Sequence, residues 1–235
     1  MKVLVTSGGT KVRIDRVRSI TNMSRGTFGS QICDSFLDRF DSTGDDEVVF
    51  FYAKNSRLPK SNKLNHVRFV EYDTFDDYRS KIKELLTKEH FDIIVLAAAV
   101  SDYGVANYFD GKYHSSDNMT IQLVKLPKVI TEVRNLALDS TICGFKLLVD
   151  STDDELRDAM EKQFSDNGIE LCVGNDLRDI KANNHRLTIK ISNVLNPTSE
   201  YFVYNKYDVE PLGMKLSDKV VDKCFEAYSL KNTKL

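Results

Sequence analysis

Two glycine-bearing segments near the start of the chain contain residue types that bind phosphate through the backbone. SGGT begins at Ser7 after a short apolar run, and NMSRGTFG covers residues 22–29 before a helical pattern. Gly26 and Gly29 would let backbone N–H groups face an anion at the helix N-terminus, where the helix dipole favours negative charge. A simple turn at SGGT and a surface charge at Arg25 are the alternatives. Neither segment matches the Rossmann G-x-G-x-x-G or P-loop pattern. Other residues must therefore decide whether the two segments bind phosphate or form simple turns.

Two further side chains could act on a bound phosphate or substrate. Asp102 follows an apolar run, so its carboxylate could hold a ribose, a metal or a substrate hydroxyl, or simply cap a turn or helix. Lys112 follows Gly111 in an aperiodic stretch, and a loop lysine can close over phosphate and neutralise charge that develops during transfer. A solvated lysine is the alternative. Tyr108 and Lys112 also match the Y-x-x-x-K pair of short-chain dehydrogenases, but that pair needs a helix, and the intervening FDG is typical of a turn.

Composition excludes several functional classes. The 235 residues have a net charge of -2 with acids and bases interspersed, so bulk electrostatics does not favour binding to nucleic acid, which usually needs a basic face. The longest apolar run, IIVLAAAV, has eight residues and is too short to span a membrane, and we expect no cleavable signal peptide. The scattered cysteines lack CxxC spacing, which indicates reduced, buried thiols in a cytoplasmic protein. The histidines lack metal-ligand spacing, so we expect no metal site made only of protein ligands.

The elements that position these residues alternate along the chain. Apolar runs predict strands over residues 2–6, 47–53, 66–72, 91–100, 140–149 and 170–175, and helical periodicity predicts helices over 30–39, 75–86, 128–138, 153–164 and 217–228. This alternation indicates an α/β fold with a parallel sheet between helices. Ligands bind at the carboxyl ends of the strands in such sheets, where SGGT, AAAVSDY, GFKLLVD and GNDL would meet.

Two stretches break this alternation. Residues 103–118 are aromatic, polar and aperiodic, as in a loop or flap. Residues 184–205 contain two alternating runs that predict a small antiparallel β excursion near the C-terminus. We expect this excursion to lie outside the sheet that makes the site and to support dimerisation. Because no linker or repeat is evident, we predict one domain over residues 1–235.

Several motifs, taken in order, resemble phosphopantothenoylcysteine synthetase of the monofunctional type. They are VTSGGTKVRID, VRSITNMSRGTFG, AAAVSDY, GKYHSS, LPKVI, GFKLLVD and GNDL. The resemblance implies a Rossmann-like parallel sheet and a ligase that joins 4′-phosphopantothenate to L-cysteine in coenzyme A biosynthesis. In this family the carboxylate attacks the α-phosphate of CTP or ATP, pyrophosphate leaves, and the cysteine amine displaces the nucleoside monophosphate from the acyl-nucleotide. Mg²⁺ accompanies the nucleotide, and the enzymes are homodimers.

The resemblance also implies roles for individual residues. Asn22 holds the substrate or the acyl intermediate and helps the cysteine step, and Lys112 helps to form the acyl-nucleotide. The remaining substrate-binding residues are Ala98, Ala99, Asp102 and, reaching across the dimer, Arg18. The nucleotide-binding residues are Gly8, Ser24, Gly26, Gly29, Asp102, Lys112, Phe145, which packs on the base, and Asn175, which hydrogen-bonds the nucleotide.

Departures from the family pattern leave the nucleotide open. Arg25 stands where many members have Ser, GFKLLVD replaces the GFAAET of the fused bacterial enzymes, GKYHSS replaces a lysine-rich run, and SDNG stands where those enzymes have lysines. The monofunctional type favours CTP, and ATP stays open. Two other hypotheses also stay open: an NAD(P)-dependent reductase that uses Tyr108 and Lys112, and a nucleotide-binding regulatory module without turnover. The presence of both Asn22 and Lys112 argues against the regulatory module.

Overall fold

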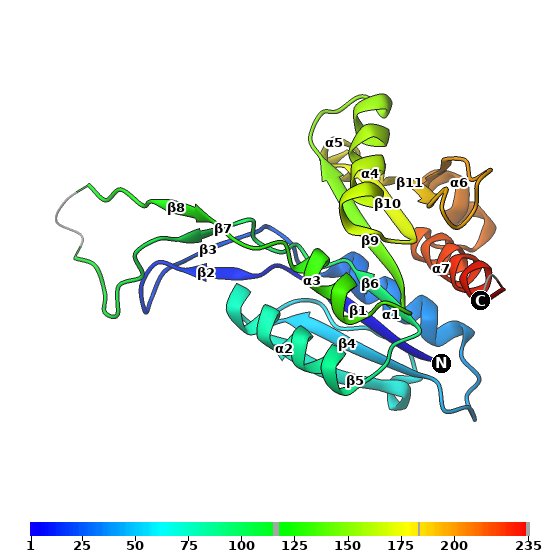
Figure 1. Ribbon diagram of the computed structural model, residues 1–235, viewed down its shortest axis with the longest axis horizontal. Helices are drawn as coiled ribbons and strands as arrows, with labels where there is room; N and C mark the ends of the chain where they lie inside the picture. The colour runs from blue at the N-terminus through cyan, green and yellow to red at the C-terminus, as the bar shows by residue number, and fades with distance from the viewer. Residues whose placement is uncertain (115–117, 183, 234–235) are drawn as a thin grey trace.

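The computed structural model describes residues 1–114, 118–182 and 184–233, and these residues form a central sheet of eight strands (Figure 1). The strand order is β12-β11-β10-β9-β6-β1-β4-β5. Six strands are parallel: β1 (Lys2–Ser7), β4 (Glu47–Ala53), β5 (Val67–Tyr72), β6 (Ile93–Leu96), β9 (Thr141–Leu148) and β10 (Leu171–Asp176). The central strands β1, β4 and β6 bury apolar residues on both faces of the sheet, as the continuous apolar runs predict, whereas the edge strand β5 leaves Phe69 40% exposed.

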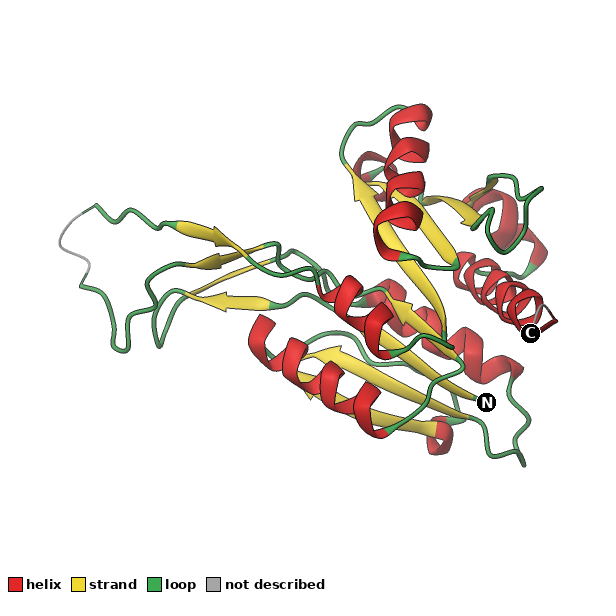
Figure 2. Ribbon diagram, viewed as in Figure 1, coloured by secondary structure: helices red, strands yellow, loops and turns green. Residues whose placement is uncertain are grey.

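Helices cover both faces of the sheet (Figure 2). One hydrophobic cluster joins the sheet to α1 (Thr27–Arg39) and α7 (Leu216–Thr233), and the other joins it to α2 (Phe75–Lys88), α3 (Val129–Leu136) and α4 (Asp153–Asn167). Shorter helical turns are η1 (Leu64–His66), α5 (Leu177–Lys181), α6 (Lys206–Val209) and η2 (Glu210–Leu212). The predicted α/β fold with a parallel sheet between helices is therefore confirmed.

The C-terminal strands correct one prediction. β11 (Arg186–Ile191) pairs antiparallel with β10, and β12 (Phe202–Asn205) pairs antiparallel with β11. The two strands are antiparallel as predicted, but they extend the central sheet, so the expectation that residues 184–205 lie outside it was wrong. The apolar face of β11 is fully buried in the same hydrophobic cluster as α7, which explains why the strand joins the sheet; its residues there are Leu187, Ile189 and Ile191. The expected role of these strands in dimerisation rested on their lying outside the sheet, so the structure removes the reason for it.

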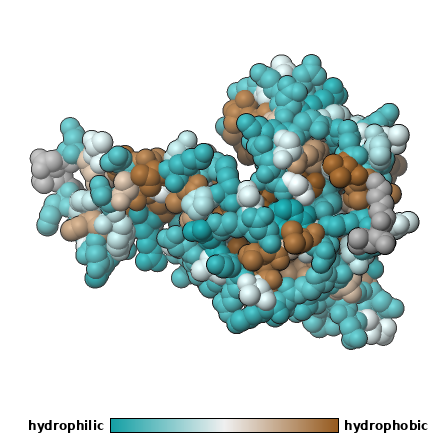
Figure 3. Space-filling view, viewed as in Figure 1, coloured by the Kyte–Doolittle hydropathy of each residue, from teal (hydrophilic) through white to brown (hydrophobic). Residues whose placement is uncertain are grey.

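Two antiparallel strand pairs leave the carboxyl edge of the sheet as a long projection, which we call the arm (Figure 1). β2 (Lys11–Arg13) pairs with β3 (Ser19–Thr21), and β7 (Tyr103–Val105) pairs with β8 (Leu123–Lys125). The start of the predicted flap, residues 103–105, is therefore a strand, and residues 115–117 of the flap lie outside the described residues. Hydrophobic side chains are exposed along the arm (Figure 3), among them Val17, Tyr103, Tyr108, Leu123 and Val124.

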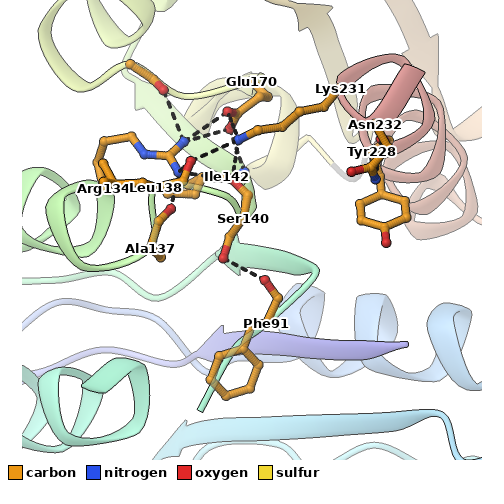
Figure 4. A network of polar contacts seen from close by, with 11 residues as sticks. Phe91, Arg134, Ala137, Leu138, Ser140, Ile142, Glu170, Tyr228, Lys231 and Asn232 are labelled. Atoms are coloured by element: carbon orange, nitrogen blue, oxygen red, sulfur yellow. Dashed lines mark hydrogen bonds and ion pairs between the residues drawn. The ribbon is translucent and has the colours of Figure 1, made fainter. Parts of the chain in front are cut away.

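An ionic network holds the opposite edge of the sheet together (Figure 4). Glu170, just before β10, accepts from Arg134 of α3 at 2.9 Å and from Lys231 of α7 at 2.6 Å. Its Oε2 also accepts from the Ile142 N–H at 2.8 Å. All three charged side chains are less than one fifth exposed. The network therefore fastens α3 and the C-terminal helix to the amino ends of β9 and β10, away from the arm. No helix in the described part of the chain is long and apolar enough to cross a bilayer.

Candidate active site

Glycines bring the end of β1 and the start of α1 into close contact. A Cβ on Gly29 would lie 2.5 Å from Ser7 Oγ, and one on Gly26 would lie 2.7 Å from the same atom. Gly8 and Gly26 also have positive φ angles of 88° and 69°, which other residues rarely adopt. The Ser7 hydroxyl donates to the Gly26 carbonyl at 3.0 Å. We call the group formed by Ser7, Gly8, Gly26 and Gly29 the glycine cradle.

The start of α1 is suited to an anion. Among the described residues, no side chain caps this helix end and no carboxylate lies in its first turn. The first N–H groups of α1, which have no carbonyl partner within the helix, and the positive end of the helix dipole therefore lie at the glycine cradle. Ser24 lies just before it, and its N–H donates to the Asn22 carbonyl at 2.8 Å. This geometry provides what a phosphate group needs.

Asn22 links the cradle to the end of β6. Its Nδ2 donates to the Ala99 carbonyl at 3.0 Å, and the Ala99 N–H donates to the Gly8 carbonyl at 2.8 Å. The neighbouring Ala98 N–H donates to Thr6 Oγ1 at 3.1 Å. The structure therefore brings Asn22, Ala98, Ala99 and the glycines together at the carboxyl edge of the sheet.

Asp102 lies where β6 passes into the arm. Its carboxylate accepts from Lys128 Nζ at 2.6 Å, and both side chains are more than half exposed. The sequence predicts the Asp102 site but assigns no role to Lys128, which directly precedes α3. The position of Lys128 after Pro127, within the LPKVI motif, is the sequence signal that could have found it.

Phe145 and Asn175 follow on the next two strands. Phe145 of β9 is half-buried and packs edge-on against Phe28 of α1, with ring centroids 6.1 Å apart. The ring of Phe28 also packs edge-on against the ring of His185, with ring centroids 5.0 Å apart. Burial lowers the pKa of His185, and among the described residues its Nε2 atom is buried without a hydrogen-bond partner. An isolated histidine before a strand offers no sequence signal for this contact.

Asp176, next to Asn175, is a buried carboxylate that the sequence does not single out. It accepts from the N–H groups of Ser151 and Arg178, each at 2.8 Å. Burial alone would raise the pKa of Asp176, but these hydrogen bonds, with those from the Ser151 hydroxyl and the Asp150 N–H, lower it to about 2. The carboxylate therefore holds the segment after β9 against the end of β10, beside Asn175.

Arg18 and Lys112 lie in the arm instead. Arg18 Nη2 donates to the Tyr113 carbonyl at 2.8 Å, and the Arg16 N–H donates to the Gly111 carbonyl at 3.0 Å. Lys112 is thus held beside the loop between β2 and β3, which lies in the outer part of the arm in Figure 1. One chain therefore places the cradle and Asn22 at the sheet edge, and Arg18 and Lys112 on the projection.

The reductase hypothesis lacks its required geometry. Residues 106–112 form no helix, the Gly111 N–H donates to the Phe109 carbonyl at 2.9 Å, and Tyr108 contacts Asp110. A groove of about 520 Å³ between the arm and α2 includes Tyr108 among its lining residues. Of the described residues that line this groove, none belongs to the predicted ligase site.

Comparison with known proteins identifies the family. Residues 1–212 match the family model described as the DNA/pantothenate metabolism flavoprotein C-terminal domain. The chain is 33% identical to the coenzyme A biosynthesis bifunctional protein CoaBC of Thermococcus kodakarensis over 177 residues, which cover 75% of this chain and 41% of the relative. The chain thus spans less than half the length of that relative.

Solved structures share the fold. The DNA/pantothenate metabolism flavoprotein from Streptococcus pneumoniae has a TM-score of 0.76 and 26% identity, covering 96% of this chain and 97% of that one. A mutant of Cab2 in complex with phosphopantothenate-cysteine has a TM-score of 0.80 and 18% identity, covering 99% of this chain and 88% of that one. The chain therefore belongs to the family of the DNA/pantothenate metabolism flavoprotein C-terminal domain, in agreement with the motifs of its sequence.

Proposed function

We propose that the protein is a nucleotide-dependent ligase that joins 4′-phosphopantothenate to L-cysteine. The observation that carries this proposal is the convergence of Asn22, Ala99 and the glycine cradle at one edge of the sheet. An anion-binding helix end beside a fixed amide suits a reaction that depends on positioning and on neutralising phosphate charge. The role of the CoaBC relative in coenzyme A biosynthesis supports the choice of substrate.

The reaction has two steps. The carboxylate of phosphopantothenate attacks the α-phosphorus of the nucleotide, a P–O bond forms, and pyrophosphate leaves. The cysteine amine then attacks the acyl carbonyl and loses a proton, and the nucleoside monophosphate leaves. The cradle and the start of α1 hold the nucleotide phosphates in both steps. The bond from Asn22 Nδ2 to Ala99 fixes the plane of the amide, so that Oδ1 offers a fixed acceptor to the incoming amine.

The nucleotide is CTP in the favoured form of this proposal, with ATP as the alternative. Phe145 packs on the base and Asn175 hydrogen-bonds the nucleotide. Mg²⁺ is the expected companion of the triphosphate, and the Asp102 carboxylate would hold it, because this ion typically takes one or two carboxylates besides the substrate phosphates. The carboxylate of Asp102 is 59% exposed, so it can exchange its Lys128 partner for the ion. When bound, Mg²⁺ shields the negative charge of the phosphates.

The active enzyme in this proposal is a homodimer in which Arg18 and Lys112 reach the neighbouring subunit's site. The arm carries both cations away from the cradle of its own chain and exposes large hydrophobic side chains, for example Val17, which is 67% exposed. A second copy of the chain would cover that surface. The hydrodynamic mass of the dimer would be about twice the chain mass of 26.8 kDa. The burial of all four cysteines as free thiols supports a cytoplasmic location.

Pyrophosphate release tests the proposed function. The assay contains Mg²⁺, 4′-phosphopantothenate, cysteine and either CTP or ATP, with phosphopantothenate omitted as the control. We expect release that needs phosphopantothenate, and the faster nucleotide identifies the natural one. Folded protein that releases no pyrophosphate with either nucleotide would contradict the proposal. Nicotinamide cofactor binding would then favour the reductase, and nucleotide binding without turnover would favour the regulatory module.

A further inference from the structure

The carboxylate of Asp15 is buried in the loop between β2 and β3 of the arm. Its residue exposure is only 1%, although it lies on a projection and outside both hydrophobic clusters. It accepts hydrogen bonds from the Val17 N–H at 2.8 Å and the Arg18 N–H at 2.7 Å, which close the loop between β2 and β3. A buried carboxylate costs free energy unless it is paired and hydrogen-bonded, so these contacts make Asp15 the fixed centre of the loop.

Asp15 also reaches a second segment that is distant in the sequence. Its Oδ2 accepts from the Tyr113 N–H at 3.2 Å and from the Arg18 guanidinium at 2.7 Å. Arg18 in turn donates to the Tyr113 carbonyl at 2.8 Å. Asp15 and Arg18 therefore hold both backbone polar groups of Tyr113, the residue that directly follows Lys112.

The contacts of the Asp15 carboxylate favour its ionised form. Burial alone would raise the pKa of Asp15, but the hydrogen bonds from the backbone N–H groups of Val17, Arg18 and Tyr113, and from the Arg18 side chain, lower it to about 2. These contacts therefore keep their full charge at neutral pH. The hydrogen bonds of Asp15 hold the cationic side chain of Arg18 and the backbone of Tyr113, which directly follows a second cation, Lys112.

We propose that Asp15 is a positioning residue that holds Arg18 and Lys112 as one unit, so that both cations enter the same active site together. This inference rests on the proposed function, in which Arg18 binds the substrate phosphate and Lys112 helps to form the acyl-nucleotide. Binding of the phosphate by Arg18 then places the Lys112 segment over the reacting carboxylate. The glycine cradle lies at the sheet edge, so nucleotide binding depends on Asp15 only through Lys112.

Asp15→Asn tests the inference because asparagine keeps the size of the side chain and removes its charge. We expect kcat to fall about 10–100-fold, since misplacing a reacting group by about 1 Å has effects of this size. The KM for phosphopantothenate should rise, whereas the dissociation constant for the nucleotide should rise no further in Asp15→Asn than in Lys112→Ala. Asp110→Asn is the matched control: Asp110 bonds Arg16 on the same arm, but both side chains are about two-thirds exposed. Such a surface pair contributes little, so this control should keep wild-type kinetics.

Double variants separate a positioning role from general damage to the arm. If Asp15 acts through the two cations, adding Asp15→Asn to Arg18→Ala should weaken phosphopantothenate binding, measured by titration calorimetry, by less than about threefold. Full additivity of the two effects on the dissociation constant, or wild-type kcat in the single Asp15→Asn variant, would overturn the inference. The proposed function is judged separately by pyrophosphate release from the wild-type protein and its loss in Lys112→Ala.

A measurement on the wild-type protein keeps the inference testable if the variant does not fold. The amides of Arg18 and Tyr113 share one acceptor residue, so both should exchange with deuterium more slowly than an unstructured peptide. We expect similar protection for the two amides. Exchange of the Tyr113 amide at the unstructured rate would overturn the inference without any substitution.

Discussion

Gly29→Ala should weaken nucleotide binding through steric contact alone. Gly29 lies in the first turn of α1, and the Cβ of alanine would lie 2.5 Å from Ser7 Oγ and 2.8 Å from Ser7 Cβ. Ordinary contacts between such atoms need about 3.5–4 Å, so the helix end must move by about 1 Å away from β1. The N–H groups that face the phosphates move with it.

The cost to folding and the cost to binding can be worked out separately. Overpacking of this kind lowers the free energy of unfolding by about 1–3 kcal/mol. Replacing glycine by alanine within a helix raises it by up to about 1 kcal/mol. The net loss in the free energy of unfolding is therefore about 0–2 kcal/mol. For binding, a displacement of about 1 Å should cost about 1.4 kcal/mol or more, which raises the dissociation constant about tenfold.

Titration calorimetry with CTP and with ATP, without phosphopantothenate, measures this effect in the absence of turnover. Gly44→Ala is the control, because its nearest atoms would lie 3.6 Å from the new Cβ. That variant should bind nucleotide as the wild type does. A dissociation constant for Gly29→Ala within about twofold of wild type, for a folded protein, would refute the assignment of the cradle to the nucleotide phosphates.

The remaining predictions concern the two reaction steps, the dimer and the fold. Lys112→Ala should abolish pyrophosphate release while leaving the circular dichroism spectrum intact, and normal turnover would remove Lys112 from the mechanism. Asn22→Asp should accumulate the acyl-nucleotide, visible by mass spectrometry, and pass it slowly to cysteine; full activity or no intermediate would contradict that role. Mixing and reassociating Arg18→Ala with Asn22→Asp subunits should restore about a quarter of the activity, because half the dimers then hold one intact site; no recovery in mixed dimers would place Arg18 in its own subunit's site. Glu170→Gln should lower the free energy of unfolding in urea by about 1–3 kcal/mol by leaving two cations poorly paired, with nucleotide binding unchanged; unaltered stability would show that the network contributes nothing.

The sequence predicts the parallel sheet well because its strands are apolar on both faces. The predicted strand over 47–53 matches β4 (Glu47–Ala53), and the helix predicted from residue 75 begins there because Thr74 caps it, accepting from the Asp77 N–H. The carboxyl-edge positions of the SGGT and AAAVSDY segments follow from the same pattern, whereas Asn22 is singled out only by the family resemblance. Local periodicity and strand-end position thus suffice for these two segments.

The arm and the C-terminal strands depend on pairing between distant residues, which periodicity does not reveal. β2, β3, β7 and β8 have three residues each, too few for a pattern. The alternation in residues 184–205 predicts strands but does not say whether they join the sheet. Asp15 is satisfied by backbone N–H groups of two segments, so its importance becomes visible only when the fold brings those segments together.

The most direct test of the ligase is the identity of what the wild-type protein makes. Protein is mixed with 4′-phosphopantothenate, Mg²⁺ and CTP or ATP, first without and then with cysteine, and the mixture is analysed by mass spectrometry. We predict an acyl-nucleotide without cysteine, and 4′-phosphopantothenoylcysteine with equal amounts of nucleoside monophosphate and pyrophosphate when cysteine is added. Nucleotide and phosphopantothenate that stay unchanged in the presence of folded protein would contradict the account.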